Sequence, residues 1–113
     1  IYFFHRNHLL LVIEIISYSY NIIGDFMFVL IERYINNMSI HDLNNLAISK
    51  GIGLSKDELE FSYNYIKKNW KNVISNYNLF DIDKYKDKFS EDNFIKIKKL
   101  IREYTIKYGN YLK

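Results

Sequence analysis

A capping motif followed by a long apolar stripe is the feature that most narrows what this chain can fold into. Ser55 and Glu58 form a Ser-x-x-Glu pattern, in which each side chain accepts a hydrogen bond from the other residue's backbone amide at a helix start. Apolar side chains then recur every three or four residues over roughly five helical turns, which places them on one face. They are Leu59, Tyr63, Ile66, Trp70, Val73 and Tyr77.

The same signals predict helices on both sides of this segment. Ser39 and Asp42 form a shorter version of the cap, and Gly51 stands where a helix end favours a left-handed residue. Ser90, two acidic residues and a further apolar stripe open the last helix. The sequence therefore predicts an all-α fold, a small single-domain bundle of about four helices. We expect these helices near residues 25–37, 40–50, 56–77 and 91–110.

Apolar positions on the predicted stripes give the expected interior of the bundle. Residues 79–89 separate the last two helices and are predicted to form a connector with one short helical turn. Within the connector, Asp81 and Asp83 are expected to be turn or capping residues. The predicted core consists of Leu43, Ala47, Leu59, Tyr63, Ile66, Trp70, Ile97, Ile101 and Tyr104.

Composition excludes several classes of protein. The 113 residues include no cysteine, no proline and 4 glycines, which excludes disulfides, thiolate metal sites and collagen-like repeats. An apolar share of 49% is enough for a packed core. Residue types with A/T-rich codons dominate, among them Ile, Asn, Lys, Tyr and Phe, which indicates an AT-rich genome. The many lysines and tyrosines therefore carry less functional information than their number suggests.

The first 26 residues are strongly apolar. Arg6 and Glu14 interrupt them, so they do not match the continuous apolar run of a transmembrane helix. The codons allowed for the residues before Met27 can contain a bacterial ribosome-binding sequence. We therefore expect this segment to be translated upstream sequence. The alternative is a real extra N-terminal helix, and a membrane role is expected only if residues 1–23 are expressed.

These observations predict that the chain is divided into two segments. Residues 1–26 are the apolar N-terminal segment, and residues 27–113 are the helical domain.

No pattern of catalytic residues is evident. The nucleotide-binding glycine loops, serine-nucleophile elbow and paired-histidine zinc motif are all absent from the sequence. Asp81, Asp83 and Asp92 occupy three positions of a calcium-binding loop, but Lys86 replaces its required glycine, so coincidence is the better explanation. We predict that the protein is not an enzyme and has no catalytic, cofactor-binding or metal-binding residues.

Positive charge is concentrated in the second half of the chain. Residues 1–65 carry a net charge of −3 and residues 66–113 a net charge of +6. Nucleic acid or an acidic partner would suit such a basic surface. A helix-turn-helix over 39–70 is disfavoured, because its second helix begins with acidic residues that phosphates would repel. The candidate contacts of a nucleic-acid-binding accessory protein are Lys67, Lys68, Lys71, Lys96, Lys99 and Arg102.

Aromatic residues on the last helix favour a different function. A short bundle has limited capacity to bury them, and aromatic side chains are enriched at the centres of protein interfaces. The leading hypothesis is therefore a non-enzymatic module that binds another protein or associates with itself. The candidate interface residues are Phe94, Tyr104, Tyr108 and Tyr111.

Four stretches of the chain resemble the YqfT-like family of short bacterial proteins of unknown function. They are Ile35 to Leu43, Leu46-Ala47, Gly51 to Ser55 and Tyr65 to Trp70, and the resemblance covers about residues 28–110. It implies a compact helical fold and a cytoplasmic location, and it implies no activity and no site residues. The tyrosine-rich last helix departs from the family's pattern.

Overall fold

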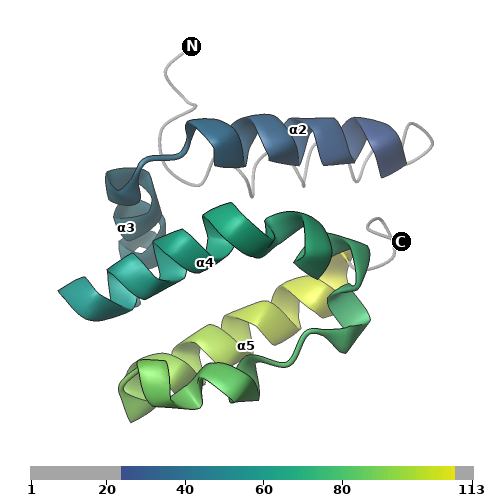
Figure 1. Ribbon diagram of the computed structural model, residues 1–113. Helices are drawn as coiled ribbons and strands as arrows, with labels where there is room; N and C mark the ends of the chain where they lie inside the picture. Colours follow the sequence, from purple (N-terminus) through teal and green to yellow (C-terminus); the bar gives the residue numbers. More distant parts are fainter. Residues whose placement is uncertain (1–23, 109–113) are drawn as a thin grey trace.

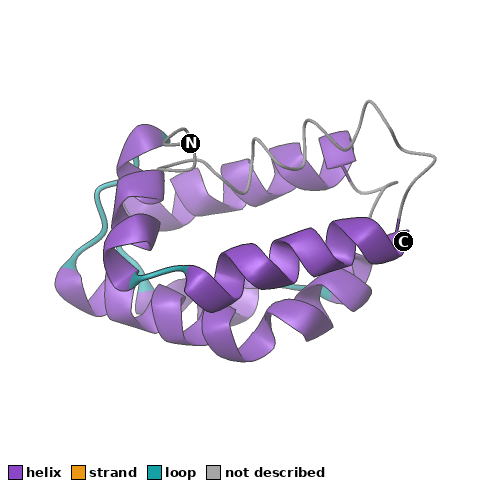
Figure 2. Cartoon of the chain, turned by 90° about the horizontal axis from the view of Figure 1, so that it is seen from above, coloured by secondary structure: helices purple, strands orange, loops and turns teal. Residues whose placement is uncertain are grey.

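The helices follow one another in the order that the caps and stripes predict (Figures 1 and 2). The structure is a computed structural model that describes residues 24–108. Within them lie α2 (Gly24–Asn37), α3 (Ile40–Ser49), α4 (Lys56–Ser75) and α5 (Glu91–Tyr108). Two 3-10 helices, η3 (Tyr77–Leu79) and η4 (Ile82–Lys88), form the connector between α4 and α5. The described residues contain no strand, so the predicted all-α class is confirmed.

Predicted and observed helix boundaries agree closely. The starts of α3, α4 and α5 match the predicted positions, and α4 ends at Ser75 where residue 77 was expected. The predicted boundary between residues 26 and 27 falls inside α2, which begins at Gly24. The predictions for residues 1–23 and 109–113 lie outside the described residues.

Short-range caps fix both ends of α3. The Ser39 hydroxyl accepts from the Asp42 amide at 3.1 Å, and the Asp42 carboxylate accepts from the Ser39 amide at 2.9 Å. At the other end, Gly51 has φ +77°, a conformation that residues with a side chain rarely adopt. The predicted cap and the predicted glycine stop are both confirmed.

α2 lies across α4 in the opposite direction and gives the protein its best-buried core (Figure 1). Ile31, which is only 1% exposed, and Ile35 pack against Trp70 of α4. The rings of Phe28 and Trp70 add an aromatic contact at 5.0 Å between centroids. These α2 residues were absent from the predicted core because α2 is apolar on several faces, so its sequence did not indicate which face is buried.

α5 runs in roughly the same direction as α4, so the connector must return along the molecule before α5 begins (Figure 1). Aromatic side chains hold this return segment against α4. Phe61 of α4 lies 5.7 Å from Tyr85 and 5.8 Å from Phe89, measured between ring centroids. The two helix N-termini consequently meet at one end of the molecule.

Only some of the predicted core residues are fully buried. Leu43, Ala47 and Trp70 are buried, as predicted. The remaining predicted core residues are half-buried, and they are Leu59, Tyr63, Ile66, Ile97, Ile101 and Tyr104. Four of them, Ile66, Ile97, Ile101 and Tyr104, line the space that α5 leaves beside α4. Buried apolar residues that the prediction missed are Ile31, Ile35, Met38, Ile52 and Phe94.

The helices within residues 24–108 are all too short or too polar to cross a bilayer.

Candidate ligand cavity

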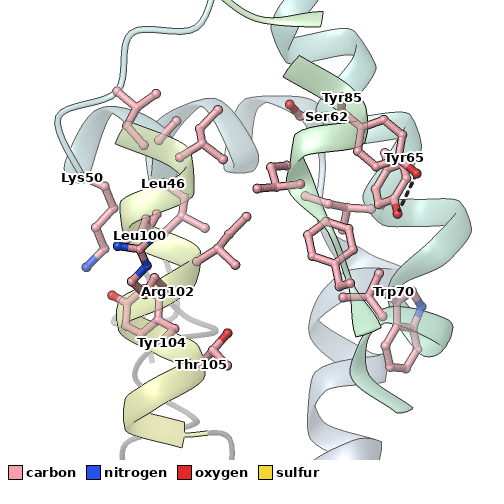
Figure 3. A pocket seen from close by; sticks show the side chains of 18 of the residues that line it. Leu46, Lys50, Ser62, Tyr65, Trp70, Tyr85, Leu100, Arg102, Tyr104 and Thr105 are labelled. Atoms are coloured by element: carbon pink, nitrogen blue, oxygen red, sulfur yellow. Dashed lines mark hydrogen bonds between the residues drawn. The ribbon is translucent and has the colours of Figure 1, made fainter. Parts of the chain in front are cut away.

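A large apolar cavity lies where α5 stands away from α3 and α4 (Figure 3). Its volume is about 680 Å³, and it is lined by α3, α4, α5 and the connector. Almost all of its lining side chains are aliphatic or aromatic. Protein interiors are normally close-packed, so a space of this size is a feature that needs an occupant or a function.

An aromatic cluster forms the wall of the cavity on the α4 side. Phe61 and Tyr65 of α4 meet Phe80 and Tyr85 of the connector, and Phe89 packs edge-on against Phe61. The centroids of Tyr65 and Tyr85 are 4.9 Å apart, and those of Tyr65 and Phe80 are 6.1 Å apart. Such tilted and edge-on contacts are favourable for aromatic rings, so they stabilise this wall.

Two hydroxyl groups in this wall satisfy each other. The Tyr85 hydroxyl donates to the Tyr65 hydroxyl at 3.3 Å. Burial first, and then the contact with Tyr85, raise the pKa of Tyr65 to about 12. Tyr65 therefore stays neutral at physiological pH, and this wall offers no charge to a ligand.

The charged groups of the cavity lie on its opposite side. Among the lining residues that the structure describes, Lys50 at the end of α3 and Arg102 on α5 are the only charged side chains, and none is a carboxylate. Figure 3 shows them on the side formed by α3 and α5, across the cavity from Tyr65 and Trp70. The Lys50 ammonium lies 5.6 Å from the ring centroid of Tyr104, a cation–π distance. The rim of the cavity is therefore positively charged on one side.

A buried carboxylate holds the near ends of α4 and α5 together. Glu58 is 6% exposed and accepts from the Ser55 amide at 2.8 Å, as its capping motif predicts. It also accepts from the Ser90 amide at 2.6 Å and from the Asn93 side-chain amide at 2.8 Å. One carboxylate thus caps two helices, and it fixes the point from which α4 and α5 diverge around the cavity.

The hydrogen bonds around Glu58 decide its charge state. Burial alone would raise its pKa, but the bonds donated by Ser55, Ser90 and Asn93 outweigh burial and hold the pKa below the ordinary value. Glu58 is therefore ionised at neutral pH. The sequence prediction of a capping residue is confirmed, whereas its burial and its contact with α5 were not anticipated.

Three of the six predicted nucleic-acid contacts are engaged within the protein. The Lys67 ammonium donates to the Ile35 carbonyl at 2.6 Å, at the C-terminus of α2. Lys71 pairs with Glu32 at 3.4 Å. Lys96 pairs with Asp92 at 3.1 Å and donates to the Gly51 carbonyl at 3.2 Å; the other candidates are Lys68, Lys99 and Arg102, which are exposed.

The predicted interface residues have different surroundings. Phe94 is only 6% exposed and packs in the interior, so it is not available as a surface contact in this structure. Tyr104 is half-buried and lines the cavity. The side chain of Tyr108 and the whole of Tyr111 lie outside the described residues.

The aspartates of the rejected calcium loop have local partners. The Asp81 carboxylate accepts from the Asp83 amide at 3.0 Å, which confirms Asp81 as the cap of η4. The Asp83 carboxylate pairs with Lys98 at 2.8 Å. In the part of the chain that the structure describes, no three His, Cys, Asp or Glu residues are grouped as metal ligands.

Sequence reasoning did not find the cavity, although one signal was present. Phe61 and Tyr65 lie one turn apart, beside the predicted stripe of α4, and so widen its apolar surface. The connector then supplies three more aromatic residues. An apolar surface wider than one neighbouring helix can cover was the available sign of an open site.

Comparison with protein families, with curated proteins and with solved structures finds no match to this chain. The resemblance to the YqfT-like family therefore stays a prediction.

Proposed function

We propose that this protein is a non-enzymatic binding protein that holds a small apolar ligand between α4 and α5. The observation that supports this proposal is the cavity of about 680 Å³ with its almost wholly apolar lining. Ligand sites in proteins commonly occupy about 300–1,000 Å³ and combine apolar walls with a few polar groups. The cavity has this size and this composition.

The cavity volume favours a small ligand over a helix of a partner protein. One turn of an α-helix with its side chains, about 10 Å wide and 5.4 Å long, fills on the order of 400 Å³. The cavity would hold fewer than two such turns, whereas helical partners use anchors spread over about two turns or more. A small molecule of chain or ring form is within the size range that such a volume accommodates.

A protein partner or a second copy of the chain is a second candidate, supported by exposed apolar residues of α5, one of which, Ile106, also lines the cavity. Ile95 and Ile106 of α5 are 59% and 76% exposed. Eleven residues correspond to about three helical turns, so these two side chains share one face of α5. This face is the surface on which the predicted interaction or self-association module would operate.

Binding of the neutral dye Nile red to the full chain tests the proposed function. Trp70 is the only tryptophan and lines the cavity, so its emission reports on the site directly. We expect one dye per chain and quenching of Trp70 emission. The informative variant is Ser62→Phe, because Ser62 lines the cavity and a phenyl group there would fill part of it.

The matched control is Asn64→Phe, which places the same side chain on an exposed position of α4 that does not line the cavity. Ser62→Phe should weaken dye binding at least tenfold, and Asn64→Phe should leave it unchanged. Circular dichroism establishes that both variants are folded. Equal dye binding by both folded variants, or no quenching of Trp70 in the natural chain, would contradict the proposal.

A further inference from the structure

We infer that the ligand of this cavity is a long-chain fatty acid whose carboxylate is held by Lys50 and Arg102. This inference rests on the proposed function and adds the chemical class of the ligand. It names two binding residues, of which Lys50 was not among the candidates that the sequence provided.

The charged side chains of the lining favour an anionic group on the ligand. Within residues 24–108, Lys50 and Arg102 are the only charged side chains that line the cavity, and both are cations. Arg102 is exposed and Lys50 is half-buried, so their charges lie at the rim, where a carboxylate can stay partly hydrated. An arginine and a lysine together can hold a carboxylate through charge-assisted hydrogen bonds. A neutral or cationic ligand would leave this positive rim unused.

The aromatic wall opposite these cations favours a hydrocarbon part of the ligand. Tyr65 and Tyr85 bond to each other across 3.3 Å, and the aromatic rings around them present apolar surface. Trp70 lies on the same side of the cavity (Figure 3). A ligand with a charged end at Lys50 and Arg102 must therefore present hydrocarbon to this wall. The described lining is mostly apolar and carries charge on one side only, which matches an amphiphile.

The length of the cavity along α4 suits a single acyl chain. Lining residues of α4 extend from Phe61 to Ile74, which corresponds to about 20 Å at 1.5 Å per residue. One leaflet of membrane hydrocarbon, which is one acyl chain deep, is about 15 Å thick. A single acyl chain therefore fits along α4, with its carboxylate at the α3 and α5 rim.

Two probes of equal chain length test the inference on the delipidated full chain. Palmitate carries the carboxylate, and 1-hexadecanol replaces it with a neutral hydroxyl. Trp70 emission and calorimetric titration at pH 7.5 give the affinity for each. We expect palmitate to bind about tenfold more tightly than hexadecanol. We also expect this preference to decrease as salt concentration rises, because part of it is screened charge attraction.

Variants assign the preference to the two cations. Lys50→Gln and Arg102→Gln should each weaken palmitate binding about fivefold, the scale of an exposed ion pair, and leave hexadecanol binding unchanged. Lys99→Gln is the matched control, because Lys99 is an exposed cation of α5 that does not line the cavity.

The outcomes separate the inference from the function on which it rests. Equal affinity for palmitate and hexadecanol would overturn the fatty-acid assignment and leave an apolar-ligand protein. Failure of both probes, together with failure of Nile red, would overturn both. If palmitate is preferred but Lys99→Gln weakens it as much as Lys50→Gln, the carboxylate is not held at the rim and the assignment fails. The comparison of probes on the natural chain needs no variant to fold.

Discussion

The carboxylate of Glu58 and the side-chain amide of Asn93 form a 2.8 Å hydrogen bond that joins the first turns of α4 and α5. In an ordinary capping box the third residue of a helix accepts from its own N-cap amide. In α5 this residue is Asn93, which instead donates to Glu58, while Glu58 accepts from the Ser90 amide. The capping carboxylate of α5 is thus supplied by another helix. Asn93 also donates to the Gly53 carbonyl at 2.9 Å, which adds the loop before α4 to the same junction.

We expect Glu58→Gln to lower the free energy of unfolding at pH 7 by about 2 kcal/mol, the cost of leaving buried groups unsatisfied. A glutamine has one acceptor oxygen, so its amide nitrogen must face an N–H group of Ser55, Ser90 or Asn93. Urea denaturation measures the effect. Glu60→Gln is the control, because Glu60 lies two residues after Glu58 and is exposed. This control substitution should change the free energy of unfolding by less than about 0.5 kcal/mol.

The pH dependence of stability gives a separate prediction for Glu58. Its pKa is lower in the folded chain than in the unfolded chain, so the folded chain holds the proton less tightly. The stability that Glu58 contributes is therefore complete above the ordinary carboxyl pKa of about 4.3 and is lost as the pH falls through the folded value. Denaturation curves between pH 6 and pH 2 should show a smaller loss for Glu58→Gln than for the natural chain. Parallel losses in the two proteins would contradict this prediction.

Packing between α2 and α4 leads to a third prediction. Ile31 is 1% exposed in the cluster with Ile35 and Trp70, so Ile31→Ala should lower the free energy of unfolding by about 3 kcal/mol. Val29 is 44% exposed on the same helix, and Val29→Ala should cost less than about 1 kcal/mol. Thermal or urea unfolding followed by Trp70 fluorescence compares the two. Similar losses for both variants would show that α2 does not pack as described.

A fourth prediction separates two adjacent lysines. Lys67 donates to the Ile35 and Asn36 carbonyls at the end of α2, at 2.6 and 3.2 Å, whereas Lys68 is exposed. A cation at a helix C-terminus is stabilising, so Lys67→Gln should cost about 1 kcal/mol of unfolding free energy. Lys68→Gln should cost almost nothing. Urea denaturation of the two variants measures the difference, and equal stabilities would mean that Lys67 is not a structural residue.

The parts of the fold that the sequence predicted depend on neighbouring residues. The caps at Ser39 and Ser55 and the left-handed Gly51 act within four residues, so their residue types specify them directly. The direction of α5 relative to α4 depends on contacts between distant residues. Glu58 and Ser90 are far apart in sequence, and neither side chain signals that the two helix starts meet.

The candidate site was harder to predict for the same reason. The lysines and aromatic residues were visible in the sequence, but their roles depend on which side chains the fold brings close to them. Lys67, Lys68 and Lys96 are the same residue type, and Lys67 and Lys96 differ from Lys68 through contacts such as those with the carbonyls of Ile35 and Gly51. The cavity depends on where α5 stops approaching α4, which no local pattern specifies.

Nucleic-acid binding, the alternative function from the sequence, leads to the last prediction. Each phosphate contact adds about −0.9 to the slope of log affinity against log salt concentration. If all six predicted cations made contacts, affinity for duplex DNA would fall about two-thousandfold between 50 and 200 mM salt. The contacts made by Lys67, Lys71 and Lys96 within the protein leave three exposed candidates, for which the loss would be about fortyfold.

Size-exclusion chromatography of the full chain with and without mixed-sequence duplex DNA, together with fluorescence titration across this salt range, measures the slope. We expect no complex, or a weak one with a slope no steeper than about −3. A steeper slope would show that the internal pairs open to bind phosphates, and nucleic-acid binding would then be the better proposal. If the chain elutes as a dimer or a larger species with and without DNA and at both salt concentrations, this would instead indicate self-association. An apolar surface such as the Ile95 and Ile106 face of α5 would then be the contact.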